Sequence, residues 1–204
     1  MKEFTTAVTA ADAEENEANP TTFLHKSSAA PDGFECVFFE PSEGQFLMML
    51  SMGGRGMKKE SIGHFIQLFI ELADDETQKY FHDLLMTRNS GFKVKGPGGI
   101  FDIWEYLVSE WTGKRFGRAV RLGQACIGHW ALIDGSLPQV DLLSLPVHRI
   151  LNIVYVWMAE RMDTEARQKW ETELDSPLPG EKARDITDTG FDDGFNQINR
   201  NDDI

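Results

Sequence analysis

The feature of this 204-residue sequence that most limits its fold is the helical spacing of its apolar residues. Between residues 62 and 73, large apolar side chains recur at alternating steps of three and one, and a closely similar series runs from residue 100 to residue 111. Such spacing places the apolar side chains on one face of a 3.6-residue period. Each face must be buried against another element, so the pattern predicts a mainly α fold.

Other segments add helices and one strand. The alternating stretch Gly33 to Pro41 predicts a short β-strand. A weaker pattern predicts a helix over residues 122–135. Further helices are predicted where a capping residue or a first-turn proline precedes an apolar stripe. Their expected first residues are Ser42, Asp75, Ser144 with Pro146 in the first turn, and Asp163.

These elements predict two small helical units between polar ends. Residues 1–33 and 179–204 contain few large apolar side chains and many acids, and are predicted to be disordered acidic tails. Residues 34–112 are predicted to form a helical N-terminal domain with a short β-strand or hairpin. A basic linker over residues 113–123 then leads to a helical C-terminal extension over residues 124–178.

The charge distribution restricts the class of partner. The net charge is −13, with six acids against two bases in residues 1–33 and ten acids against three bases in residues 171–204. Sequence-independent nucleic-acid binding needs a basic surface, so no nucleic-acid partner is expected. No apolar run approaches the roughly 20 residues that span a bilayer, so no membrane contact is expected either.

Two further observations indicate the compartment. No basic and apolar leader opens the sequence, so no secretion signal is expected. Cys36 and Cys126 are far apart and lack a CxxC pattern, which predicts reduced thiols. Both observations favour the cytoplasm.

The sequence contains little that demands catalysis. None of the five histidines has a recognisable metal-binding spacing, and no cofactor is expected. Cys126 with His129 leaves a small hydrolase or metal enzyme as a minor alternative. The aromatic and methionine content instead favours partner binding without an enzyme activity. The positions predicted to contact partners are the apolar stripes: Ile62, Phe65, Phe69, Ile100, Ile103, Trp104, Leu107, Trp111, Ile150, Leu151, Val154, Tyr155 and Trp157.

Two stretches, IWEYLVSEWTGK (103–114) and DLLSLPVHRILNIVYVWMAERMDTEARQKWETELDSPLPG (141–180), carry a family resemblance. The chain resembles the tail-assembly chaperones of long-tailed, noncontractile phages, most of all those of phages that infect actinobacteria. Similarity to the shorter chaperone lies in the motif residues Trp104, Val108, Glu110, Trp111 and Gly113. Similarity to the downstream reading frame lies in Ser144, Leu145, Pro146, Arg149, Leu151 and Asn152. Together the similar segments cover about residues 34–180.

The resemblance implies a function in the host cell cytoplasm. Such chaperones bind the long helical tape measure protein, keep it soluble and recruit the major tail protein, and they are absent from the finished virion. In this family a programmed ribosomal frameshift makes a fusion product. The second helical unit here follows the first directly, which fits either that fusion or a single-gene variant. A structural virion protein, such as a tail-completion or connector subunit that self-assembles, is the alternative, and a homo-oligomer is compatible with both.

Overall fold

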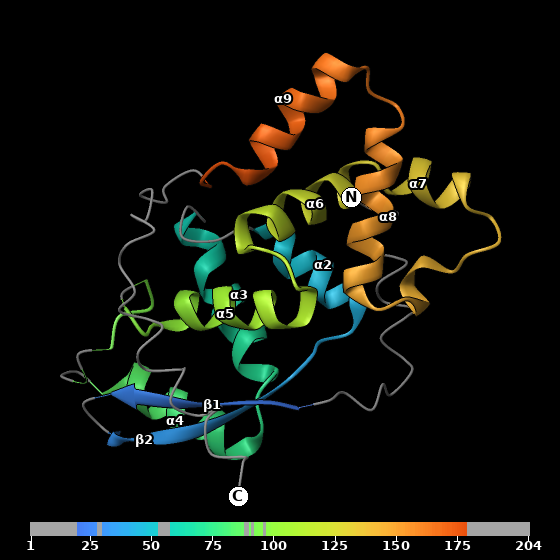
Figure 1. Ribbon diagram of the computed structural model, residues 1–204. Coiled ribbons are helices and arrows are strands. Elements are labelled where there is room, and N and C mark those ends of the chain that lie inside the picture. Colours follow the sequence, from blue (N-terminus) through green and yellow to red (C-terminus); the bar gives the residue numbers. More distant parts are fainter. Residues whose placement is uncertain are drawn as a thin grey trace, which may run out of the picture.

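The computed structural model describes residues 20–27, 30–52, 58–87, 90, 92–95 and 97–178. Two strands precede the helices, and Figure 1 shows this hairpin at one end of the molecule and α9 at the other. The mainly helical fold is confirmed. The elements are β1 (Pro20–Ser27), β2 (Ala30–Phe39), α2 (Glu43–Met52), α3 (Lys59–Glu71), α4 (Asp75–Met86), α5 (Ile100–Thr112), α6 (Phe116–Gly128), α7 (Trp130–Ser136), the 3-10 helix η1 (Leu142–Ser144), α8 (Val147–Ala159) and α9 (Thr164–Asp175).

The hairpin contributes one side of the core. β1 and β2 are antiparallel, with Phe23 opposite Cys36 and His25 opposite Phe34. Alternation along each strand turns every second side chain to the same face. Phe23, His25 and Cys36 are therefore buried against the helices.

The expectation of a disordered tail over residues 1–33 is wrong for the described part, residues 20–27 and 30–33, which is β-strand. The stretch is polar in composition, but its inward positions carry the large rings of Phe23 and His25. Burial of these rings compensates for the ordering of the strand. The other parts of the two predicted tails, residues 1–19, 28–29 and 179–204, lie outside the described residues.

Backbone hydrogen bonds join the hairpin to the turn between α3 and α4. The Phe39 amide donates to the Leu72 carbonyl at 2.8 Å, and the Asp74 amide donates to the Val37 carbonyl at 3.1 Å. Asp74 also caps α4, because its carboxylate accepts from the Thr77 amide at 2.9 Å. The helix start is thereby fixed to the edge of β2.

A buried histidine connects the hairpin to the entry of α5. His25 Nε2 lies 2.8 Å from the Gly98 carbonyl, which can only accept, so Nε2 carries the proton. His25 Nδ1 then accepts from the Tyr80 hydroxyl at 2.9 Å, and the Ser27 hydroxyl donates to Tyr80 at 2.7 Å. The Gly98 amide donates to the Asp102 carboxylate at 2.8 Å. Every step of this chain of bonds is made with neutral His25.

The predicted basic linker over residues 113–123 is wrong, because most of it is helix. Gly113, at φ +62°, ends α5 in the left-handed conformation that suits glycine, and α6 begins at Phe116. α6 lies between α2, α5, α8 and α9 and buries an apolar face among them. Its fully buried apolar side chains are Ala119, Val120, Leu122 and Cys126.

The described residues of the two predicted units share one continuous core, which extends from β1 to α9. The closest contact across the predicted boundary is between α2 and α6. A Cβ atom placed on Gly123 would lie only 2.9 Å from Leu50 Cβ, so glycine allows the two helices to meet at this point. Figure 1 shows α6 in the middle of the molecule rather than between two bodies.

Candidate functional site

Most of the residues predicted to contact partners are core residues in this structure. Nine of the thirteen are less than a tenth exposed, whereas Ile62, Trp111, Tyr155 and Trp157 are half-buried. Helical spacing marks the side of a helix that faces another helix, whether that helix belongs to the same chain or to a partner. The nine buried residues are Phe65, Phe69, Ile100, Ile103, Trp104, Leu107, Ile150, Leu151 and Val154.

Two of the half-buried residues contribute to packing within the chain. Trp111 Nε1 donates to Thr21 Oγ1 at 2.8 Å, and its ring stands edge-on to Phe46 with centroids 5.5 Å apart. Ile62 packs against the core from α3. The surface contribution of the predicted stripes therefore reduces to Tyr155 and Trp157, which lie on opposite flanks of α8.

Trp157 contacts α7. Its Nε1 donates to Ser136 Oγ at 2.9 Å, and its ring centroid is 6.0 Å from that of His129. The guanidinium of Arg161 lies over the Trp157 ring, 3.9 Å from the centroid, as expected for a cation–π contact. The indole is thus held in one orientation at the surface.

Two exposed apolar side chains belong to the same two helices as these contacts. Leu132 is 64% exposed and lies between His129 and Ser136 on the same side of α7, by its spacing of three and four residues. Val156, 51% exposed, precedes Trp157 on the outer face of α8. Leu132, Val156 and Trp157 are called the α7–α8 apolar patch below. Leu132 and Val156 are absent from the sequence-based prediction because neither continues a buried stripe.

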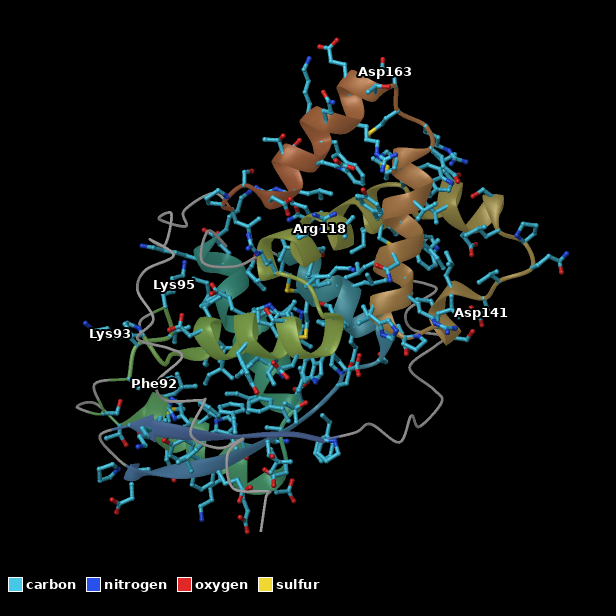
Figure 2. The ribbon with its side chains drawn as sticks, in the orientation of Figure 1. Phe92, Lys93, Lys95, Arg118, Asp141 and Asp163 are labelled. Carbon is cyan, nitrogen blue, oxygen red and sulfur yellow. The ribbon has the colours of Figure 1, made fainter. Side chains whose placement is uncertain are left out.

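The basic residues near the start of α6 connect this helix to α8 and α9. Lys114 Nζ donates to Asn152 Oδ1 at 2.7 Å, and Arg118 Nη1 pairs with Asp175 at 3.0 Å. Arg121 reaches the end of α9, seven residues after Lys114. Steps of four and three place the three cations on one side of the chain, a signal that was available in the sequence. Figure 2 shows Arg118 on α6, below α9, whose capping residue Asp163 lies at the far end of that helix.

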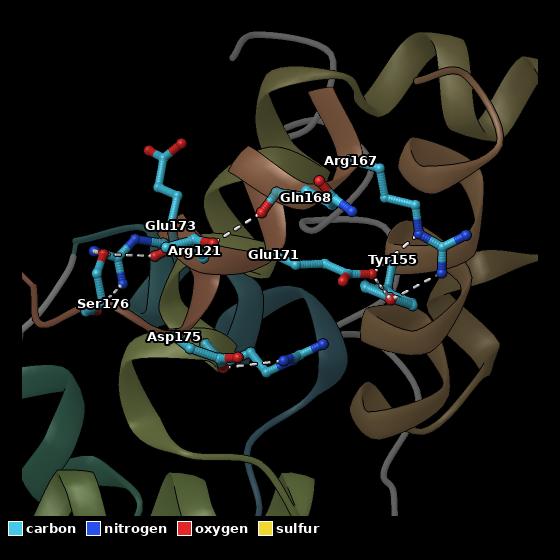
Figure 3. A network of polar contacts seen from close by, with 10 residues as sticks. Arg121, Tyr155, Arg167, Gln168, Glu171, Glu173, Asp175 and Ser176 are labelled. Carbon is cyan, nitrogen blue, oxygen red and sulfur yellow. Dashed lines mark hydrogen bonds and ion pairs between the residues drawn. The ribbon is translucent and has the colours of Figure 1, made fainter. Parts of the chain in front are cut away.

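Tyr155 completes this surface from α8. Its ring stacks on Trp170 of α9 with centroids 5.4 Å apart, and the Arg118 guanidinium lies 5.3 Å from the centroid of the same ring. The Tyr155 hydroxyl donates to Glu171 Oε1 at 2.7 Å, and Arg167 Nε donates to the same oxygen at 3.0 Å (Figure 3). These bonds, from Tyr155 first and Arg167 second, lower the pKa of Glu171. Arg118, Arg121 and Tyr155 are called the α9-binding face below.

The pair Cys126 and His129 has the environment of a packing residue and a surface residue. Burial raises the pKa of Cys126 to about 12, which favours the thiol, whereas a catalytic cysteine acts as thiolate. His129 is exposed beside Trp157. Among the described residues, no group of three or more His, Cys, Asp or Glu side chains is placed to hold a metal ion.

Two general findings complete the description. None of the helices in the described part of the chain combines the length and the apolar character needed to cross a bilayer. In comparisons with known proteins, no family model, no curated protein and no solved structure matches this chain.

Proposed function

We propose that this protein is a phage tail-assembly chaperone that binds the helical tape measure protein and helps to recruit the major tail protein. The resemblance of residues 103–114 and 141–180 to such chaperones supplies the identity of the client. The observation that carries the proposal is the α7–α8 apolar patch, where Leu132 and Val156 are more than half exposed on the two helices that hold an oriented indole.

The patch has the chemistry of a helix-binding surface. Exposed aliphatic side chains on two neighbouring helices suit the apolar stripe of an amphipathic helix, which presents side chains every three or four residues. The guanidinium of Arg161 on Trp157 adds a cation beside the apolar surface. A long helical client would thus be held by apolar contact at Leu132 and Val156 and oriented by charge at Arg161.

The single core also affects how two partners are bound. The segments similar to the two reading frames are not separate units, because Lys114 bonds Asn152 and α6 packs on α2 and α8. In this proposal the tape measure protein and the major tail protein contact one body. The buried stripes stabilise that body, and the exposed residues of α7 and α8 bind the client.

Co-expression with the tape measure protein of the same genome tests the proposal. We expect the wild-type chain to keep the tape measure protein soluble and to co-purify with it. The double substitution Leu132→Glu and Val156→Glu should abolish both effects, because carboxylates on the patch disfavour apolar contact. Met86→Glu is the matched control, since Met86 is an exposed apolar residue (83%) on α4, at the hairpin end.

The outcomes separate the candidate functions. Loss of solubilisation in the patch variant alone supports the chaperone. If the wild-type chain neither solubilises nor retains the tape measure protein, the proposal fails. Finding the chain at constant copy number in purified virions would instead favour the structural tail component, because an assembly chaperone leaves before the particle is complete.

A further inference from the structure

The helix α9 is attached to the rest of the protein by a narrow set of contacts. Leu174 is the buried residue of this helix, and Trp170 and Glu171 are half-buried. The remaining positions of α9 are exposed. A short connection, residues 160–163, joins α9 to α8, and Leu178, just after α9, is also buried against the core.

Polar bonds at the end of α9 provide much of the attachment. Arg121 donates to the Ser176 carbonyl at 2.6 Å, to Ser176 Oγ at 3.1 Å and to the Pro177 carbonyl at 2.9 Å. These acceptors belong to the capping residue Ser176 and the next residue, so the guanidinium fixes the segment that follows α9 (Figure 3). Arg118 adds an ion pair to Asp175 between partly exposed side chains. Water can replace each of these bonds when α9 leaves, because the groups lie near the surface.

The surface beneath α9 would keep its shape without the helix. Tyr155 belongs to α8 and Arg118 and Arg121 to α6, two helices anchored in the core by fully buried residues such as Val120 and Val154. The surface combines an aromatic plane with two cations. α9 matches it with an aromatic ring, a leucine four residues later and acids next to both, in the pattern Trp-Glu-x-x-Leu-Asp.

We propose that the α9-binding face is a second interaction surface, which binds a partner helix with the chemistry of α9: an aromatic residue and a leucine four positions apart, each followed by an acid. In the free chain, α9 occupies this surface and is displaced by the partner. Charge complementarity carries the choice of partner, because Arg118 pairs with Asp175 of α9, a helix that has four acids and two bases. The inference is independent of the phage-tail proposal and of the α7–α8 apolar patch.

Fluorescence anisotropy with a labelled peptide tests the inference. The probe is residues 164–178 as a synthetic peptide, added to the full chain. Trp170→Ala with Leu174→Ala in the chain removes the two main anchors of its own α9 and leaves the binding face intact. We expect the peptide to bind this variant at least tenfold more tightly than wild type, because the competing helix is weakened. Glu165→Ala with Lys169→Ala, an exposed pair on α9, is the matched control and should bind like wild type.

Two further arms test specificity. A peptide with alanine in place of Trp170 and Leu174 should not bind. Arg121→Gln, added to the chain that carries Trp170→Ala and Leu174→Ala, should lower the affinity of the original peptide several-fold. The proposal is overturned if the peptide binds equally well to the wild type and to the Trp170→Ala, Leu174→Ala variant, or if the altered peptide binds as well as the original one.

Hydrogen exchange on the wild-type chain gives a test that does not depend on the loosened variant folding. We expect α9 amides to exchange faster than those of α6 and α8, through an opening that leaves the core protected. Addition of the peptide should accelerate α9 exchange further, because it occupies the face that α9 leaves. If α9 amides exchange only when the whole protein unfolds, the helix is a fixed part of the fold and the proposal is wrong.

Discussion

The hairpin end and the α9 end of this protein are stabilised by different kinds of contact. At the hairpin end, the ring of Phe38 is fully buried, and its centroid lies 5.8 Å from that of Phe23 and 4.9 Å from that of Phe69. At the α9 end, Leu174 and Leu178 are buried, and the other contacts are a half-buried aromatic stack and polar bonds near the surface. Water cannot replace ring packing but can replace surface polar bonds. We therefore expect the α9 end, and not the hairpin end, to open without unfolding of the rest of the molecule.

The largest effect is expected at the hairpin end. Phe38→Ala should lower the free energy of unfolding by about 3–5 kcal/mol, because it leaves a cavity among packed rings. Phe39→Ala, one residue later and 38% exposed, should change it by less than about 1 kcal/mol. Urea unfolding followed by circular dichroism measures both. Similar losses in the two variants would contradict the assignment of Phe38 to a tightly packed core.

A smaller effect is expected where α2 meets α6. Gly123→Ala should destabilise the protein by about 1–3 kcal/mol, because the added methyl group overlaps Leu50. Gly63→Ala, on an exposed position of α3 with no atom within 4 Å of the added Cβ, should stabilise it by about 0.5–1 kcal/mol through helix propensity. Thermal unfolding of the pair gives opposite shifts of Tm if α2 and α6 meet as described. A gain of stability in both would place Gly123 outside a close contact.

A pH-dependent contribution is expected from His25. Burial lowers the pKa of His25 below its usual 6.5, while the bond to Gly98 acts in the opposite direction. The unfolded chain therefore binds a proton more readily than the folded chain, so stability from this group is complete above about pH 6.5 and is lost as pH falls below it. His25→Gln should flatten the dependence of unfolding free energy on pH in that range. His82→Gln on the exposed side of α4 is the control, and an unchanged slope in His25→Gln would refute the assignment.

The smallest effect is expected at the α9 end. Arg121→Gln removes bonds to the Ser176 and Pro177 carbonyls just after α9 and should cost about 1 kcal/mol, with a weaker effect at high salt. Lys169→Ala breaks an exposed ion pair with Glu165 and should cost less than about 0.5 kcal/mol. Differential scanning calorimetry measures both. A loss from Arg121→Gln as large as that from Phe38→Ala would remove the contrast between the two ends.

Helices with a clear stripe or cap were predictable from the sequence. The periodic segments starting near residues 62 and 100 correspond to α3 and α5, and Asp163 caps α9 by accepting from the Ala166 amide at 2.8 Å. The helix predicted over residues 122–135 covers the second half of α6 and most of α7, whereas the first half of α6 is not predicted because its cations interrupt the apolar pattern. β1 is not predicted because Phe23 and His25, its buried positions, lie in a mostly polar stretch that favours a disordered interpretation.

The surfaces were harder to predict than the core. Apolar spacing predicts partner contacts for Tyr155 and Trp157 together with nine core residues, because the spacing does not indicate whether the same chain or a partner covers the apolar face. Leu132 and Val156 lie outside any stripe, and Arg118 and Arg121 were assigned to a linker. Whether these residues form a surface depends on their exposure and on their tertiary contacts. Local periodicity indicates neither of these properties.

The contact between Leu50 and Gly123 has a consequence for the way the chain is synthesised. The apolar face of α2 is complete early in translation, but the helix that covers it is made more than seventy residues later, by the difference between the two positions. During that interval the nascent chain exposes the side of α2 that includes Leu50, and such surfaces attract other proteins before a domain is closed. Ribosome pausing before residue 123 would lengthen this exposure, so the pace of translation itself influences the yield of folded protein.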